Sequence, residues 1–189
     1  MTKLCEIAEK YLVDKCPKIF HYYTPEYHEL FKDYNPKKFL EIGIGNYGLM
    51  SHYCGENYER GASLKMWREY FKDCHIYGCD IIEDVIFQDD RISTIVADQS
   101  NPASLENMME KFGNMDVILD DGSHFLHHQL TSIRTLWKYV NDYYIIEDIY
   151  GFNEYQSLKD ELDNCEIVLE YKHEKDCQGF IVFKRLKQE

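Results

Sequence analysis

The sequence predicts an α/β fold: a seven-stranded, mostly parallel sheet with helices on both faces and an antiparallel hairpin at its C-terminal end. Short apolar runs alternate along the chain with segments of helical spacing. Two of these runs end in acids, in DVILDDGSH (116–124) and YYIIED (143–148). A glycine-rich loop, GIGNYG (43–48), follows the first apolar run of the predicted sheet, at 38–42. In a doubly wound sheet the carboxyl ends of the strands border the ligand crevice, so these three segments are expected to meet at one site.

The elements follow in a regular order. Helical spacing covers 3–14 and 24–31, a region that is expected to cap the sheet or line the site. Strands are then expected at 38–42, 75–79, 93–97, 117–119, 143–146, 166–171 and 179–184, and helices at 63–71, 101–112, 124–139 and 154–162. Asn101 is the expected cap of its helix, with Pro102 in the first turn. A charged turn without a helix joins the last two strands, which predicts a hairpin.

Length and composition favour one domain. The chain has 189 residues, of which 44% are hydrophobic, and this is enough for one sizeable core. We expect a single domain over 1–189, with a helical cap at 1–36 and a Rossmann-like core at 37–189.

Charge and cysteine usage exclude several classes of protein. The net charge of −13 argues against a nucleic-acid binder, because such proteins need clustered Lys and Arg. The seven cysteines form no CxxC pair, so we expect free thiols in a reducing cytosol rather than disulfides or zinc. No stretch is long and apolar enough to span a membrane, and the N-terminal segment is amphipathic and charged. The expected location is the cytoplasm, or the host cytoplasm for a viral protein.

The glycine loop formally matches GxGxxG, but it departs from a dinucleotide site. A polar loop at 49–62 is expected between it and the next helix, and Asp80 lies well beyond the roughly 20-residue offset that is typical of NAD binding. Acids at successive strand ends, namely Glu41, Asp80 and Asp98, suit a cofactor with a ribose diol and an adenine amine. The alternative is that Asp80 and Asp98 only cap turns or helices.

The acids at the two later strand ends predict a cation. Asp120, Asp121, Glu147 and Asp148 would meet at one edge of the sheet and repel one another unless a positive charge neutralised them. Mg²⁺ is the ordinary candidate, since it is a hard ion that binds oxygen ligands.

Five segments in this order carry a specific resemblance: LEIGIGNYG, GASLKMWREYF, IYGCDI, DVILDDGSH and IIEDIY. Together they resemble the S-adenosylmethionine-dependent sugar O-methyltransferases that tailor macrolide antibiotics, of the macrocin and mycinamicin type. The resemblance runs from about Phe39 to Tyr150 and implies a Rossmann-like class I methyltransferase. In size and style the chain is also similar to giant-virus enzymes that methylate the 2-hydroxyl of L-rhamnose. The macrolide enzymes are longer, so their oligomeric state and acceptor pocket do not carry over.

The resemblance also implies roles for particular residues. Asp121, Glu147 and Asp148 would hold Mg²⁺, and His124 would be the general base beside Asp121. S-adenosylmethionine would be bound by Glu41, Gly43, Gly45, Tyr47, Ser63, Trp67, Asp80, Asp98 and Asp120. The acceptor would be a sugar or glycan, with rhamnose expected, and a homodimer is a further expectation.

His124 has support from a second comparison. Catechol-type O-methyltransferases carry a Lys three residues after the first metal-binding acid, and this chain has His124 in that place. A vicinal sugar diol resembles a catechol, because both hydroxyls can chelate one Mg²⁺. The alternative is a histidine that caps a helix or packs. His127 and His128 read as ordinary helix residues.

Two rival functions remain open. Tyr155 and Lys159 match the YxxxK pair of short-chain dehydrogenases, which would make the chain an NAD(P)-dependent enzyme acting on a nucleotide sugar. The expected Ser upstream of that Tyr is missing, and a Tyr and a Lys one turn apart on a surface helix explain the match equally. The other rival is a cofactor-binding module without turnover, which would need neither the acids nor His124.

Overall fold

The computed structural model describes residues 1–173 and 178–187. The helices are α1 (Lys3–Tyr11), α2 (Tyr23–Phe31), α3 (Tyr47–Cys54), α4 (Ala62–Tyr70), α5 (Pro102–Phe112), α6 (Leu126–Leu136), α7 (Asn153–Gln156) and α8 (Leu158–Glu161), with 3₁₀ turns at Glu83–Val85 and Trp137–Tyr139. The strands are β1 (Lys38–Ile42), β2 (His75–Asp80), β3 (Gln88–Asp89), β4 (Ile92–Val96), β5 (Met115–Asp120), β6 (Val140–Ile149), β7 (Cys165–Lys172) and β8 (Gly179–Arg185).

One sheet contains all of these strands in the order β3-β4-β2-β1-β5-β6-β8-β7. The inner pairs β4–β2, β2–β1, β1–β5 and β5–β6 are parallel, whereas β6–β8 and β8–β7 are antiparallel. The mostly parallel sheet and its terminal hairpin therefore confirm the predicted fold class. The described strands number eight rather than seven, because the two-residue β3 pairs with the edge of β4 and is too short to leave a periodic signal.

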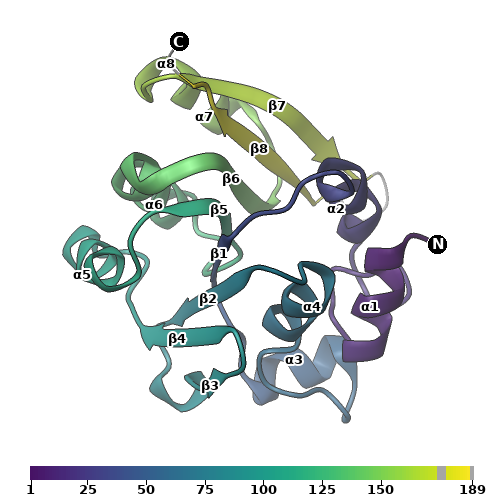
Figure 1. Ribbon diagram of the computed structural model, residues 1–189. Helices are drawn as coiled ribbons and strands as arrows, with labels where there is room; N and C mark the ends of the chain where they lie inside the picture. The colour runs from purple at the N-terminus through teal and green to yellow at the C-terminus, as the bar shows by residue number, and fades with distance from the viewer. Residues whose placement is uncertain (174–177, 188–189) are drawn as a thin grey trace.

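Helices cover both faces of the sheet, as predicted. The helices α1, α2 and α4 lie on one face, and α5 and α6 lie on the other (Figure 1). Strand alternation divides the core in the same way: Phe39 packs with the first group of helices, and the next residue, Leu40, packs with the second. The two faces are thus covered by separate apolar cores, and the polar strand ends remain at the edge between them.

Three local predictions need correction. The segment 49–62, expected as a polar loop, contains most of α3, which begins at the loop because the side chain of Asn46 accepts a hydrogen bond from Leu49 N. The first helix ends at Tyr11 rather than Asp14, since Leu12 takes a left-handed conformation with φ 56°. His124 does not open α6, because the helix begins at Leu126.

The Asn101 cap and the Pro102 start of α5 are confirmed. Cys5, Cys16, Cys54, Cys74, Cys79 and Cys165 carry free thiols, while Cys177 and residues 174–177 of the expected charged turn lie outside the described residues. Over the parts of the chain that are described, none of the helices has the length and apolar character that crossing a membrane requires.

Candidate active site

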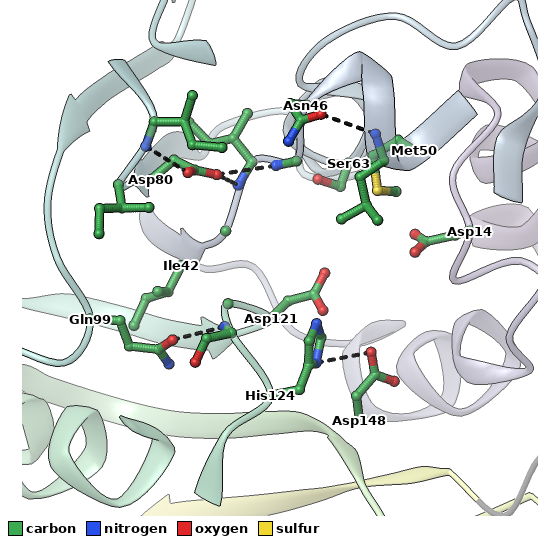
Figure 2. A pocket seen from close by; sticks show the side chains of 18 of the residues that line it. Asp14, Ile42, Asn46, Met50, Ser63, Asp80, Gln99, Asp121, His124 and Asp148 are labelled. Atoms are coloured by element: carbon green, nitrogen blue, oxygen red, sulfur yellow. Dashed lines mark hydrogen bonds and ion pairs between the residues drawn. The ribbon is translucent and has the colours of Figure 1, made fainter. Parts of the chain in front are cut away.

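A cavity of about 610 Å³ lies at the carboxyl ends of the parallel strands, where the sequence places its acids. Its walls come from the glycine loop, from the ends of β2, β4, β5 and β6, and from Val13, Asp14, Phe20 and His21 of the N-terminal segment. Figure 2 shows the glycine loop with Asp80 along one wall and Asp121, His124 and Asp148 along another. The cavity therefore has two ends of different chemistry.

The glycine loop is packed directly against the end of β5. Gly43 has φ 96°, and its N–H donates to Cys79 O at 2.8 Å. A Cβ at this position would overlap the backbone carbonyl of Asp121, so only glycine permits the close approach of the two strand ends. Gly43 and Gly45 both line the cavity.

Asp80 and Asp98 line the same end of the cavity, and both also hold their own turns. Asp80 accepts hydrogen bonds from Ile44 N at 2.9 Å, Gly45 N at 3.2 Å and Ile82 N at 3.0 Å. Asp98 accepts from the backbone and hydroxyl of Ser100, and these bonds lower its pKa. Both residues therefore cap turns, as the alternative predicted, and both carboxylates also border the cavity.

The two acids that end β5 have different surroundings. Asp120 is fully buried and accepts from Tyr144 Oη at 3.2 Å and from Gln99 Nε2. Burial raises its pKa to about 7, although the hydrogen bonds lower it. Asp121, the next residue, lines the cavity, and Asp120 does not. Asp120 therefore anchors the strand end from behind.

A bulge turns the end of β6 toward the cavity. The register of β6 on β8 shifts between Ile146 and Ile149, and Asp148 within this bulge has φ 55°. Its carboxylate lies 3.1 Å from His124 Nδ1, and His124 itself has φ 59°. Left-handed backbone is uncommon for residues other than glycine, although Asp and His adopt it more often than most, and such strain gathers at functional sites.

Asp121, His124 and Asp148 form a compact group at this end. Each offers one ligand atom, and these atoms all lie within 4.8 Å of one another. Carboxylate oxygens are ligands that a hard cation such as Mg²⁺ prefers, so the two acids fit a divalent ion at the wall of the cavity. Glu147, the third expected acid, is 1% exposed and does not line the cavity.

A buried lysine occupies the space behind these acids. Lys15 is 1% exposed, and its Nζ bonds to Asp121 Oδ2 and, at 2.7 Å, to Glu147 Oε2. Glu41 Oε1 lies 3.5 Å from the same nitrogen. Burial lowers the pKa of Lys15, but these three carboxylates and that of Asp14 outweigh burial and raise it well above its ordinary value. Burial raises the pKa of Glu41 to about 7, while Lys15 lowers it.

Two tyrosines of α2 complete the arrangement. Tyr23 donates its hydroxyl to Asp148 at 2.6 Å, and Tyr27 donates to Glu147 at 2.5 Å. Burial raises the pKa of both phenols, so they remain donors at neutral pH. Residues 15–27 thus supply a hydrogen-bond donor to each acid at the ends of β5 and β6 that the sequence assigned to the metal.

Aromatic side chains of the N-terminal segment and α3 stand at the cavity mouth. Phe20 is 43% exposed and Tyr53 is 46% exposed, and their ring centroids lie 5.0 Å apart. Tyr150, after β6, also lines the cavity and is exposed. Exposed rings of this kind offer an apolar surface for a sugar or ring ligand.

The structure does not bring every expected residue to the cavity. Ser63 is among the lining residues, but Trp67 is fully buried in an aromatic cluster with Tyr27, Phe39 and Phe71. Leu64, Trp67 and Phe71 share one helical face, which is the pattern of a core residue. Glu41 lies behind the wall beside Lys15.

Tyr47 and the YxxxK pair also lie away from the cavity. Tyr47 is exposed, and its hydroxyl donates to Glu56 O at 3.2 Å. Tyr155 is buried and donates to Gln129 at 2.5 Å, and neither it nor Lys159 lines the cavity. The dehydrogenase reading therefore has no geometric support.

Several lining residues went unnoticed in the sequence. Gln99 accepts from Ser123 N at 2.9 Å and fixes the loop after β5, and His128 lies 2.7 Å from the Ser123 hydroxyl. His128 is therefore not an ordinary surface residue of α6. Asp14 and His21 reach the cavity from the N-terminal segment. The sequence carries a weak indication for Gln99, because it directly follows Asp98, the acid at the end of the predicted strand 93–97.

Comparisons with known proteins agree with this geometry. No family model matches the chain. Demethylmacrocin O-methyltransferase of Streptomyces fradiae is 36% identical over 151 residues, which are 78% of this chain and 36% of that protein. The 8-demethyl-8-alpha-L-rhamnosyl tetracenomycin-C 2'-O-methyltransferase of Streptomyces olivaceus is 35% identical over 133 residues, 68% of this chain and 33% of that protein.

A solved structure extends the similarity to the fold. The MycE methyltransferase of the mycinamycin biosynthetic pathway, in complex with Mg, SAH and mycinamycin VI, superposes with a TM-score of 0.78 at 27% identity. The match covers 97% of this chain and 55% of that one. The chain thus spans about a third of the length of the curated relatives and about half of the solved one. By sequence and by fold, it is a homologue of the S-adenosylmethionine-dependent sugar O-methyltransferases.

Proposed function

We propose that this chain is an S-adenosylmethionine-dependent O-methyltransferase, formed as one domain over residues 1–189, that methylates a sugar hydroxyl. One observation carries the proposal: a single cavity joins a glycine loop and ribose-type acids at one end to Asp121, His124 and Asp148 at the other. A methyl donor and an acceptor must meet in one enclosed space for direct transfer. The cavity volume of about 610 Å³ is within the range of ligand sites.

The cofactor end would bind by backbone approach and by carboxylates. Gly43 and Gly45 let the loop pack closely at the cavity wall, and Asp80 would accept from a ribose hydroxyl with the one acceptor site that its three backbone bonds leave over. Asp98 lies at the next strand end, where an adenine amine could donate to it. Glu41 and Asp120 would act from behind the wall, because both are buried.

The metal would be held at the other end. Asp121 and Asp148 face the cavity and have the hard oxygen donors that Mg²⁺ takes. Glu147, the third ligand expected from the sequence, is buried beside Asp148 and already accepts from Lys15 and Tyr27, so it would support the site from behind the wall. A divalent ion bound there would lower the pKa of a sugar hydroxyl and orient it.

His124 is the proposed general base. Its Nδ1 is bonded to Asp148, and in Figure 2 the other ring nitrogen points toward Asp121. Asp148 thereby fixes the ring so that Nε2 takes the hydroxyl proton. S-adenosylmethionine supplies the methyl group, so a carbon–oxygen bond forms as the carbon–sulfur bond breaks and the cofactor sulfur becomes a neutral thioether.

The acceptor is proposed to be a glycan or glycoside with a vicinal diol, and the 2-hydroxyl of L-rhamnose is the specific candidate. The names of the relatives support it, since one acts at the 2'-position of a rhamnosyl compound. Phe20 and Tyr53 at the mouth would contact the apolar face of the sugar or its aglycone.

The test is a methyl-transfer assay on rhamnosides with and without an attached nucleotide, read by mass spectrometry. Transfer should require Mg²⁺ or Mn²⁺ and stop in EDTA, while calorimetric binding of S-adenosylhomocysteine should persist in EDTA. Cofactor binding with no transfer to any diol-bearing acceptor would favour the non-catalytic module. Full turnover in EDTA would refute the metal role.

A further inference from the structure

The charge balance behind the cavity wall points to a role for Lys15 that the reaction alone does not require. Three carboxylates, those of Glu41, Asp121 and Glu147, lie within ion-pair distance of its Nζ. Among the residues that the structure describes, no other Lys or Arg forms an ion pair with any of these three acids. We call Glu41, Asp121, Glu147 and Asp148 the carboxylate cluster.

The backbone holds Lys15 in place. Its carbonyl accepts hydrogen bonds from Tyr23 N and Thr24 N, both at 3.1 Å, and so satisfies two N–H groups of the first turn of α2. The Asp14 carbonyl accepts from His21 N and closes the intervening turn. These bonds fix the backbone at Lys15, so its side chain enters the cluster from a defined position at the start of α2.

Lys15 is also too buried to be a surface ion pair. Its side chain is 1% exposed, and those of Glu41 and Glu147 are 0% and 1% exposed. A buried charge left without its partner is strongly destabilising, whereas removing both partners together is far less so. Without Lys15, the carboxylates would have to protonate, separate or recruit another cation.

We propose that Lys15 is a positioning residue: a resident cation that keeps the carboxylate cluster assembled when no divalent ion is bound. Folding and cofactor binding are then independent of the metal, and only turnover depends on it. The inference deepens the proposed function and rests on it for the presence of a divalent ion at Asp121 and Asp148. The wild-type site is ready to receive the ion, because the ion does not have to gather the acids.

The first test compares Lys15→Met with the wild type by thermal unfolding in EDTA and in excess MgCl₂. Met keeps the length of the side chain without its charge. In EDTA the variant should unfold about 10 °C lower than the wild type, and MgCl₂ should recover at least half of that difference. The wild type and Lys18→Met, which removes an exposed lysine paired with Glu9, should change little between the two buffers. An equal loss in both buffers would overturn the proposal, since a role in packing alone does not respond to the metal.

A double variant separates charge from packing. Lys15→Met combined with Glu147→Gln removes one cation and one acid together, so it should unfold in EDTA well above Lys15→Met. If Lys15→Met does not fold, the double variant still decides, because the proposal requires that it fold in EDTA. A double variant as unstable as the single one, or one that does not fold, would overturn the proposal.

A third measurement keeps this inference apart from the proposed function. S-adenosylhomocysteine should bind wild type equally in EDTA and in MgCl₂, but it should bind Lys15→Met at least about tenfold more weakly in EDTA than in MgCl₂. Failure of the wild type to bind it at all would refute the methyltransferase proposal and leave the unfolding comparison standing. Metal-independent binding by the variant would count against Lys15.

Discussion

The two ends of the cavity are built in opposite ways. At the cofactor end, Asp80 and Asp98 are held by N–H groups of their own or neighbouring loops. At the catalytic end, Asp121, Glu147 and Asp148 are held by side chains that lie more than a hundred positions earlier, in Lys15, Tyr27 and Tyr23. One end is assembled locally and the other by long-range contacts. Removing a reacting side chain at one end should therefore leave the other end intact, whereas removing the buried Lys15 should disturb both.

The largest expected effect is at the catalytic end. His124→Ala should lower kcat by about 10² to 10⁴, because the acceptor hydroxyl loses its positioned base, while S-adenosylhomocysteine binds as before. Rate measurements under saturating cofactor, with calorimetry on the same protein, would check both statements. His127→Ala is the control, since His127 is exposed and does not line the cavity. An unimpaired His124→Ala enzyme would remove His124 from the reaction.

A second prediction concerns pH and Glu41, the acid buried behind the cavity wall beside Lys15. Burial raises the pKa of Glu41 from 4.5 to about 7, so its contribution to stability is present below pH 4.5 and is lost as the pH rises through 7. The shift corresponds to about 3 kcal/mol in the free energy of unfolding. In Glu41→Gln, the loss of unfolding free energy between about pH 5 and about pH 8 should be smaller than in the wild type by about that amount.

Urea unfolding at the two pH values would test it, with the exposed Glu166→Gln as control. The same pH dependence in both variants would mean that Glu41 stays ionised throughout.

The cofactor end should respond more weakly. Asp80→Ala removes the acceptor that is proposed for the ribose hydroxyls, and it should weaken binding of S-adenosylmethionine by about 1 to 3 kcal/mol, roughly 5- to 150-fold. Part of the loss would come from the glycine loop, because Ile44 N and Gly45 N lose their partner. Calorimetry against the exposed Asp84→Ala control would measure it, and unchanged affinity would exclude Asp80 from the site.

The smallest effect is expected at the mouth. Phe20→Ala and Tyr53→Ala should each raise the KM for the acceptor by about 2- to 10-fold, with kcat and cofactor affinity nearly constant, because each ring contributes only stacking. Leu186→Ala has a matched exposure of 44%, against 43% for Phe20, and should leave KM unchanged. A change confined to kcat would place the rings in the reaction rather than in recognition.

The same contrast explains what could be predicted from the sequence. The succession of strands and helices along the chain and the C-terminal hairpin follow from hydrophobic periodicity. The positions of Asp80, Asp98, Asp121 and Asp148 at the cavity follow from acids at strand ends, which are also a local signal. The helix α3 was missed because its cap, Asn46, lies inside the glycine motif and reads as part of it.

Lys15 could not be predicted in this way. Nothing in the segment 13–20 distinguishes Lys15 from the exposed Lys18, and only the tertiary fold brings it to partners 106 and 132 residues away. The sequence indicated Mg²⁺ among these acids, and the fold adds a buried lysine beside the proposed metal site. Trp67 is the opposite case: the resemblance implied a cofactor contact, but its helical spacing with Leu64 and Phe71 already indicated the core, where the structure places it.

The span of the Lys15 contacts also bears on the order in which the protein folds. The bond from Lys15 to Glu147 closes a loop of 132 residues, and its partner strand β6 is among the last of the parallel strands to be made. Contacts of such separation form late, since their loop-closure entropy has to be offset by structure that already exists. The cofactor end can close on a nascent chain that ends soon after β4, whereas the catalytic end must wait for β6. In refolding, protection of the amides that bond β1 to β2 should therefore precede protection of the amides of β6.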